Sequence, residues 1–180
     1  MRNLQRYGNE CIAELADMGI DVSGLPVIIW SINNRAKSRF GQCHNIRSEG
    51  RSEINIAKFL LDENITPDDA GLKNTIIHEL LHTLAPGEGH RGKWKKLADS
   101  VTRKSNGKYV IKRCSSYEEK GVDRDSLQIT SRKRSKAKYV IRCEHCGMTA
   151  TRTRMTKVIK RPDLYRCGKC NGKLIVDSVI

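Results

Sequence analysis

The segment His78-Glu79-Leu80-Leu81-His82 most limits what this chain can form, because its chemistry requires a helix. Residues four apart lie on the same helix face, so that both imidazoles can reach one zinc ion. Glu79 lies beside them and need not bind the metal. It can take a proton from water, whose pKa a zinc ion lowers to about 7, and pass it to a leaving amine. The motif therefore indicates the catalytic centre of a metallopeptidase.

The residues around the motif predict the helix that it needs. The segment 66–69 begins this helix, with Thr66 as the N-cap, Pro67 in the first turn and an acidic residue in the capping-box position. The helix should stop before Pro86. Six aliphatic side chains cover about half of its circumference and leave the two histidines on the opposite side. These six are Leu72, Ile76, Ile77, Leu80, Leu81 and Leu84.

A catalytic zinc ion needs a third protein ligand and an open fourth position. His90 is the best candidate, because the turn formed by residues 86–89 could fold it back onto the helix. An acidic ligand would have to be a residue such as Asp99. His44 is better explained as the cap of a strand end.

Four cysteines in two C-x2-C pairs predict a second metal site. Twenty residues separate the pairs, which is a spacing typical of a tetrahedral structural zinc site. Gly147 and Gly172 follow the pairs, where tight turns need conformational freedom. A unit this short has little core, so metal binding would supply much of its folding energy. The four predicted ligands are Cys143, Cys146, Cys167 and Cys170.

The remaining cysteines and the hydropathy pattern point to a reducing compartment. Cys11, Cys43 and Cys114 are scattered, and a total of seven does not suit a secreted disulfide scaffold. No run of 18 apolar residues is present, and residues 1–6 lack the apolar centre of a signal peptide. We expect a soluble cytoplasmic protein without membrane contacts, with association with the nucleoid as a further option.

The net charge of +14 lies entirely in the C-terminal part of the chain. Residues 1–100 contain 13 basic and 13 acidic side chains, whereas residues 101–180 contain 21 and 7. This asymmetry favours a phosphate-binding surface over a merely solvated one, and DNA, single-stranded or distorted, as a partner. The candidate contacts are Arg132, Lys133, Arg134, Lys136, Lys138, Arg152 and Arg154.

Together these patterns predict an α+β chain. A zincin-like metallopeptidase domain would occupy residues 1–114, with a small three-stranded ribbon before the metal-binding helix. A basic polar linker would follow at 115–137, and a four-cysteine β zinc ribbon at 138–180. Further helices are expected over residues 4–18 and from about Gly89. The expected strands are Val27–Trp30, Arg39–His44, Ser52–Lys58, Tyr139–Arg142, Thr149–Met155 and Lys173–Val176.

The chain resembles the SprT-like family of zinc metallopeptidases. The matching residues are Ile77–Thr83, Gly89-His90 and Trp94, followed by Tyr109–Arg113, Glu118–Lys120 and the ribbon segment Tyr165–Cys170. The resemblance covers the chain from about Val27 onward. It implies that His78, His82 and His90 bind the catalytic zinc and that Glu79 is the base.

The family also includes Spartan-type proteases, which degrade proteins crosslinked to DNA. By this analogy the chain would be an endopeptidase that cleaves protein substrates associated with DNA. A catalytically idle nucleic-acid-binding zinc protein is one alternative, and a peptidase whose basic half binds acidic protein is another. Tyr109, Tyr117 and Arg91 are each candidates for stabilising the oxyanion.

Overall fold

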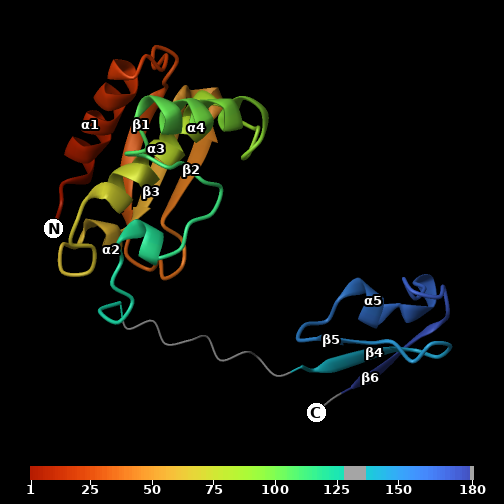
Figure 1. Cartoon of the computed structure of the whole chain (residues 1–180). Helices are drawn as coiled ribbons and strands as arrows, with labels where there is room; N and C mark the ends of the chain where they lie inside the picture. Colours follow the sequence, from red (N-terminus) through yellow and green to blue (C-terminus); the bar gives the residue numbers. More distant parts are fainter. Residues whose placement is uncertain (128–136, 179–180) are drawn as a thin grey trace. The chain divides into compact units, whose positions relative to one another are not determined.

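The chain divides into two compact units, Met1–Ile129 and Thr130–Ile180 (Figure 1). The structure is a computed structural model, and it describes residues 1–127 and 137–178. The basic residues predicted at positions 132, 133, 134 and 136 lie outside this part of the chain. No helix in the described ranges is both long enough and apolar enough to cross a bilayer.

The first unit contains a three-stranded sheet with the order β1-β3-β2. The strands are β1 (Val27–Asn33), β2 (Gly41–Ile46) and β3 (Arg51–Ala57). The central strand β3 pairs parallel with β1 and antiparallel with β2, with Gly41 opposite Ile56. The predicted three-stranded element is confirmed, with each strand within a few residues of its expected position.

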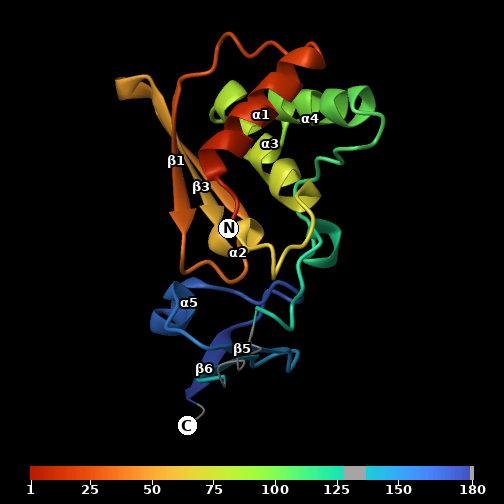
Figure 2. The same cartoon turned by 90° about the vertical axis from the view of Figure 1, so that its left-hand side faces the viewer.

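Helices cover one face of this sheet (Figures 1 and 2). Helix α1 packs against β1 and α3, α3 packs against β2 and β3, and α4 packs against α3. The six aliphatic side chains of α3 are buried and form the centre of the core. The helices are α1 (Leu4–Asp17), α2 (Lys58–Leu61), α3 (Ala70–Leu84) and α4 (Gly92–Lys104).

Helix α3 begins three residues later than the capping pattern predicts, because Asp69 and not Thr66 is its N-cap residue. The Thr66 side chain is buried, and its hydroxyl donates to the Phe59 carbonyl over 2.8 Å instead of capping the helix. Asp68 supports the helix start, because its Oδ1 accepts from the Ala70 N–H over 3.0 Å. Tertiary packing of Thr66 therefore overrides the local signal.

The first unit also reaches further than the expected boundary at residue 114. The 3-10 helix η2 (Glu118–Lys120) packs against α3, and both Lys120 and Val122 are buried. The Asp123 N–H donates to the Ile65 carbonyl over 2.8 Å. Residues 118–123, expected in the linker, thus belong to the first unit.

The second unit is a small antiparallel sheet with the order β5-β4-β6. The three predicted strands are present, but β5 ends at Arg152 instead of Met155, and a short helix follows it. Ile159 from this helix is buried against the sheet. The elements are β4 (Tyr139–Cys143), β5 (Thr149–Arg152), α5 (Lys157–Lys160), η3 (Pro162–Leu164) and β6 (Leu174–Ser178).

Candidate metal centres

The structure brings three histidine side chains together in the first unit. His78 and His82 extend from the same face of α3, one turn apart. Their Nε2 atoms lie 3.3 Å from each other, and the Nε2 of His90 lies 3.1 Å and 3.2 Å from them. All three residues are partly buried.

The turn after α3 returns His90 to the helix. Gly87 and Gly89 adopt φ values of +87° and +59°, in the left-handed region that glycine tolerates best. Strand β2 and the turn after it hold the other side of this region. The Asn45 amide donates to the His82 carbonyl and the Arg47 guanidinium donates to the Pro86 carbonyl, each over 3.0 Å.

The spacing of the three nitrogens fits a zinc ion. Zn–N bonds of about 2.0–2.1 Å in a tetrahedron place neighbouring nitrogens about 3.3–3.4 Å apart. Burial, followed by repulsion between the imidazoles, lowers the pKa of His78 to about 3 and that of His82 to about 4. Burial also lowers the pKa of His90. The rings are therefore neutral near pH 7, which is the form that binds metal.

The Trp94 ring packs against all three imidazoles. Its ring is 1% exposed and stacks on His82, with centroids 5.2 Å apart and an interplanar angle of 25°. The centroids of His78 and His90 lie 4.9 Å and 4.6 Å from it, in edge-on orientations. Trp94 is one of the residues that carry the family resemblance, but the sequence pattern does not indicate this contact.

Glu79 is buried beside the histidines. Burial raises its pKa to about 7, although the charges of Lys120 and Arg39 and a hydrogen bond from the Cys43 backbone lower it. A Cβ atom at Gly41 would lie 2.6 Å from Oε1 of Glu79, so that this glycine leaves space for the carboxylate. In the sequence, a single glycine at the start of a strand does not indicate that it leaves space for a carboxylate.

The histidines and Glu79 line an open cavity of about 690 Å³. Strand β2 and the segment 112–115 form its other walls, together with Lys120. Burial lowers the pKa of Lys120 to about 8, whereas the charges of Glu79 and Glu119 raise it. Sequence reasoning missed Lys120 as a site residue, because its neighbours suggested a polar linker.

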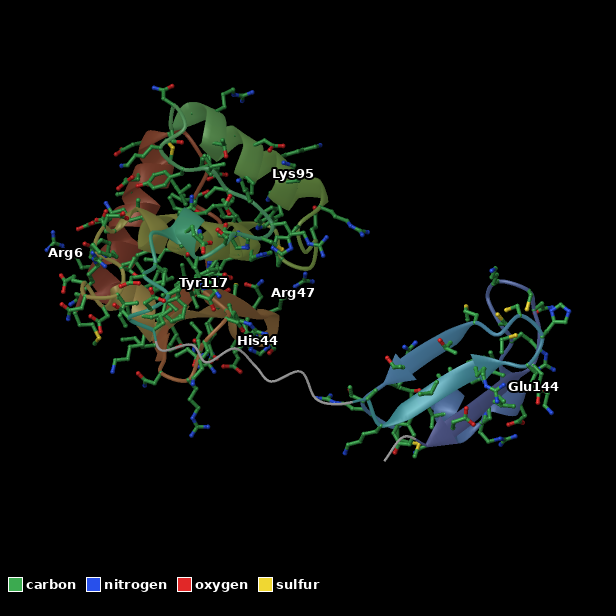
Figure 3. The ribbon with its side chains drawn as sticks, turned by 60° about the horizontal axis from the view of Figure 1, so that its bottom comes forward. Arg6, His44, Arg47, Lys95, Tyr117 and Glu144 are labelled. Atoms are coloured by element: carbon green, nitrogen blue, oxygen red, sulfur yellow. The ribbon has the colours of Figure 1, made fainter. Side chains whose placement is uncertain are left out.

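Five residues considered as ligands or oxyanion donors lie outside this cavity. The Tyr109 hydroxyl donates to Glu14, and the Tyr117 hydroxyl donates to the Lys37 carbonyl. Arg91 is the exposed residue before α4, and Asp99 accepts from Lys95 over 2.6 Å on the surface. His44 is exposed on β2 rather than at its end (Figure 3).

The second unit brings the four cysteine sulfurs within 4.8 Å of one another. The Sγ atoms of Cys143 and Cys170 lie 3.5 Å apart, and those of Cys146 and Cys167 lie 3.6 Å apart. Zn–S bonds of about 2.3 Å in a tetrahedron give about 3.8 Å, so this group is also compatible with zinc. Glu144 lies at the surface of this unit (Figure 3).

Backbone N–H groups point at the sulfurs. Hydrogen bonds from the Cys146 and His145 backbone lower the pKa of Cys143, and the Lys169 N–H donates to the Cys167 sulfur over 3.4 Å. Such donors favour thiolates, the form that binds metal.

The two glycines after the cysteine pairs have different roles. Gly147 adopts a φ of +69°, as the sequence predicts. Gly172 has no positive φ, and Asn171 adopts the left-handed conformation in its place, with a φ of +58°. A Cβ at Gly172 would lie 3.0 Å from the Cys143 sulfur and 3.2 Å from the Cys170 sulfur, so that lack of space requires glycine there.

The structure describes three of the residues predicted to contact nucleic acid. Lys138, Arg152 and Arg154 are all exposed. The backbone of Lys138 pairs with that of Arg152 at the end of β5, over 2.9 Å. Arg154 lies beyond the end of β5, so of these two arginines only Arg152 is on the strand.

Comparison with known proteins assigns the chain to a family. The SprT-like family model matches residues 8–115, more than half of the chain. The chain belongs to the SprT-like family. Protein SprT-like from Bacillus velezensis is 26% identical over 147 residues, covering 79% of this chain and 78% of the relative. The part of the chain that aligns with this relative, 79% of 180 residues, is longer than residues 1–115. The similarity to the relative therefore extends beyond the residues that the family model matches. Membership is consistent with metallopeptidase chemistry.

Proposed function

We propose that this protein is a zinc-dependent endopeptidase, with a zincin-like first unit, that acts on DNA-associated proteins. The observation that carries the peptidase assignment is the convergence of three neutral imidazoles beside the buried carboxylate of Glu79 in one open cavity. A zinc ion held by His78, His82 and His90 would polarise a peptide carbonyl and lower the pKa of water.

Glu79 moves the proton in this proposal. Its carboxylate accepts a proton from the attacking water, whose oxygen forms a bond to the carbonyl carbon. The carboxyl group then gives that proton to the amide nitrogen as the C–N bond breaks. Gly41 supports this role, because it leaves the carboxylate free to face the cavity. The four cysteines would hold a second, structural zinc ion in the second unit.

The variant Glu79→Gln tests the peptidase assignment. It removes the base and retains all three candidate ligands, so zinc content and melting temperature should stay unchanged. Cleavage of a flexible protein substrate should fall by roughly 10²-fold or more. His44→Gln, at an exposed imidazole outside the cavity, is the matched control. Equal activity of Glu79→Gln and an active wild type would mean that Glu79 is not the base. No activity in zinc-loaded wild type would favour the idle nucleic-acid-binding alternative.

The charge distribution supports DNA as the location of the substrate. All of the +14 net charge lies after residue 100, and Lys138, Arg152 and Arg154 are exposed. Each phosphate contact on single-stranded DNA should contribute about −0.7 to the log–log slope of affinity against salt. Binding enzyme and substrate to one strand would raise their effective concentration. A cytoplasmic, nucleoid-associated location is part of this proposal.

Charge reversal at Arg132, Lys133 and Arg134 tests the DNA assignment. We expect weaker and less salt-dependent binding of single-stranded DNA, and loss of DNA-stimulated cleavage, with zinc content unchanged. Unstimulated cleavage of a flexible peptide should persist. If the wild-type chain shows no salt-dependent DNA binding, the basic half is better explained as a docking surface for acidic protein.

A further inference from the structure

The cavity contains a buried cation that the proposed mechanism does not use. Lys120 is 5% exposed, whereas Arg39, Lys112 and Arg113, which also line the cavity, are exposed. Its ammonium group donates to Asn74 Oδ1 over 2.6 Å. Within the described part of the chain it forms no ion pair, and the neighbouring Glu119 pairs with Lys112 instead. A buried ammonium without a carboxylate partner is costly, which marks it as a candidate for function.

The backbone around Lys120 is fixed against the metal-binding helix. A Cβ at Gly71, in the first turn of α3, would lie 2.0 Å from the Lys120 carbonyl oxygen, so only glycine permits this contact. Gly121 follows with a φ of +62°, and a Cβ there would lie 3.0 Å from the Asp68 carboxylate. Asn74 precedes His78 by one turn of the same helix. Helix α3 therefore carries His78 and His82 and also positions the ammonium group through Asn74.

We propose that Lys120 is a catalytic residue that stabilises the negative charge developing on the attacked carbonyl oxygen. This inference rests on the proposed peptidase function. Asn74 accepts one N–H of the ammonium group and leaves two donors for the cavity. Lys120 keeps its proton throughout, and Glu79 carries the transferred one. A fixed, buried cation stabilises developing charge more strongly than an exposed one, because little water screens it.

Lys120→Met removes the charge and keeps the length of the side chain. We expect kcat for a peptide substrate to fall roughly 10²–10³-fold, with KM and zinc content little changed. A phosphinate analogue of the same peptide, which is tetrahedral and anionic, should lose affinity by a similar factor. Lys95→Met, at an exposed lysine on α4, is the matched control and should retain both kcat and phosphinate affinity.

Asn74→Asp provides a second variant in case Lys120→Met fails to fold. It retains the side-chain shape but places a carboxylate against the ammonium group, so kcat and phosphinate affinity should both fall. Unchanged phosphinate affinity in a folded Lys120→Met or Asn74→Asp protein would overturn the inference while leaving the peptidase assignment intact. If zinc-loaded wild type itself neither cleaves peptides nor binds the phosphinate, both proposals fail together.

Discussion

At the scale of single residues, a missing side chain on β2 determines the space available to Glu79. The Glu79 carboxylate comes within 2.6 Å of the place that a Cβ at position 41 would take, and the Cys43 backbone donates to it from the same strand. Strand β2 therefore determines the position of the Glu79 carboxylate together with α3, the helix that carries this residue.

Gly41→Ala should displace this carboxylate. The added methyl group would lie 2.6 Å from Oε1, so the side chain must rotate away from its present position. We expect kcat to fall by roughly 10²-fold, a loss comparable to a displacement of a reacting group by about 1 Å. Peptide cleavage measures the effect, and zinc analysis confirms that the ligands still bind.

Gly24→Ala is the control for this variant. Gly24 has open space around its Cβ position and no positive φ. It should retain wild-type activity. Wild-type turnover in Gly41→Ala would mean that the carboxylate can act from another rotamer.

Six candidate ligands could be predicted from the sequence, because helical spacing and C-x2-C spacing fix which side chains face one another. His90 could be predicted from the short turn of residues 86–89. Gly41 and Lys120 could not, because both matter only through contacts with α3 across the fold. The reason for glycine at position 172 could not be predicted either. Glycine is required there because the position lies next to two cysteine sulfurs, and not because of its φ.

At the scale of elements, Glu14 connects α1 to α3 and to the segment after α4. Its carboxylate accepts hydrogen bonds from the Tyr109 hydroxyl and from Lys73 and Lys108, each lysine over 2.9 Å. Although burial acts to raise it, these bonds lower the pKa of Glu14 to about 2, from an ordinary value of 4.5. One side chain thus helps to hold three parts of the first unit together.

Glu14→Gln should therefore destabilise the first unit in a pH-dependent way. A carboxyl group with a lowered pKa stabilises the fold above its unfolded pKa, and this contribution is lost as pH falls from about 4.5 to about 2. We expect the free energy of unfolding at pH 7 to fall by about 1–2 kcal/mol, after allowance for solvent screening. The difference should shrink towards pH 3.

Urea unfolding at pH 7 and at pH 3.5 measures this difference. Glu63→Gln, at an exposed carboxylate paired with the N-terminus, is the control and should cost little. A difference between Glu14→Gln and wild type that is independent of pH would contradict an electrostatic origin.

Most elements could be predicted from periodicity, because burial of one face requires it. The start of α3 could not, since Thr66 bonds to the Phe59 carbonyl seven residues earlier. The segment 118–123 looks like a linker because it is polar, yet Gly71 lets its backbone pack closely on α3. Local composition does not reveal such long-range contacts.

At the scale of the whole molecule, the chain joins two units that each contain one group of candidate metal ligands. A three-histidine site leaves a position for exchange, whereas a four-cysteine site is closed. The two groups should therefore differ in how readily they release zinc.

A mild chelator should remove one zinc ion before the other. We expect peptide cleavage to disappear while one zinc ion per chain remains and the second unit stays folded. Elemental analysis and nuclear magnetic resonance of the second unit, at increasing chelator concentration, measure the two events. A single zinc ion in carefully loaded protein, or simultaneous loss of both, would contradict this expectation.

Because Trp94 packs against the three imidazoles, its fluorescence should respond to changes at the three-histidine site. The chain contains two tryptophans, and the other one, Trp30, packs against Gly8 in α1. In a Trp30→Phe protein, one indole ring would emit, with its centroid 4.6–5.2 Å from the three imidazole centroids. Its fluorescence would then follow occupation of the three-histidine site in real time, without an added dye.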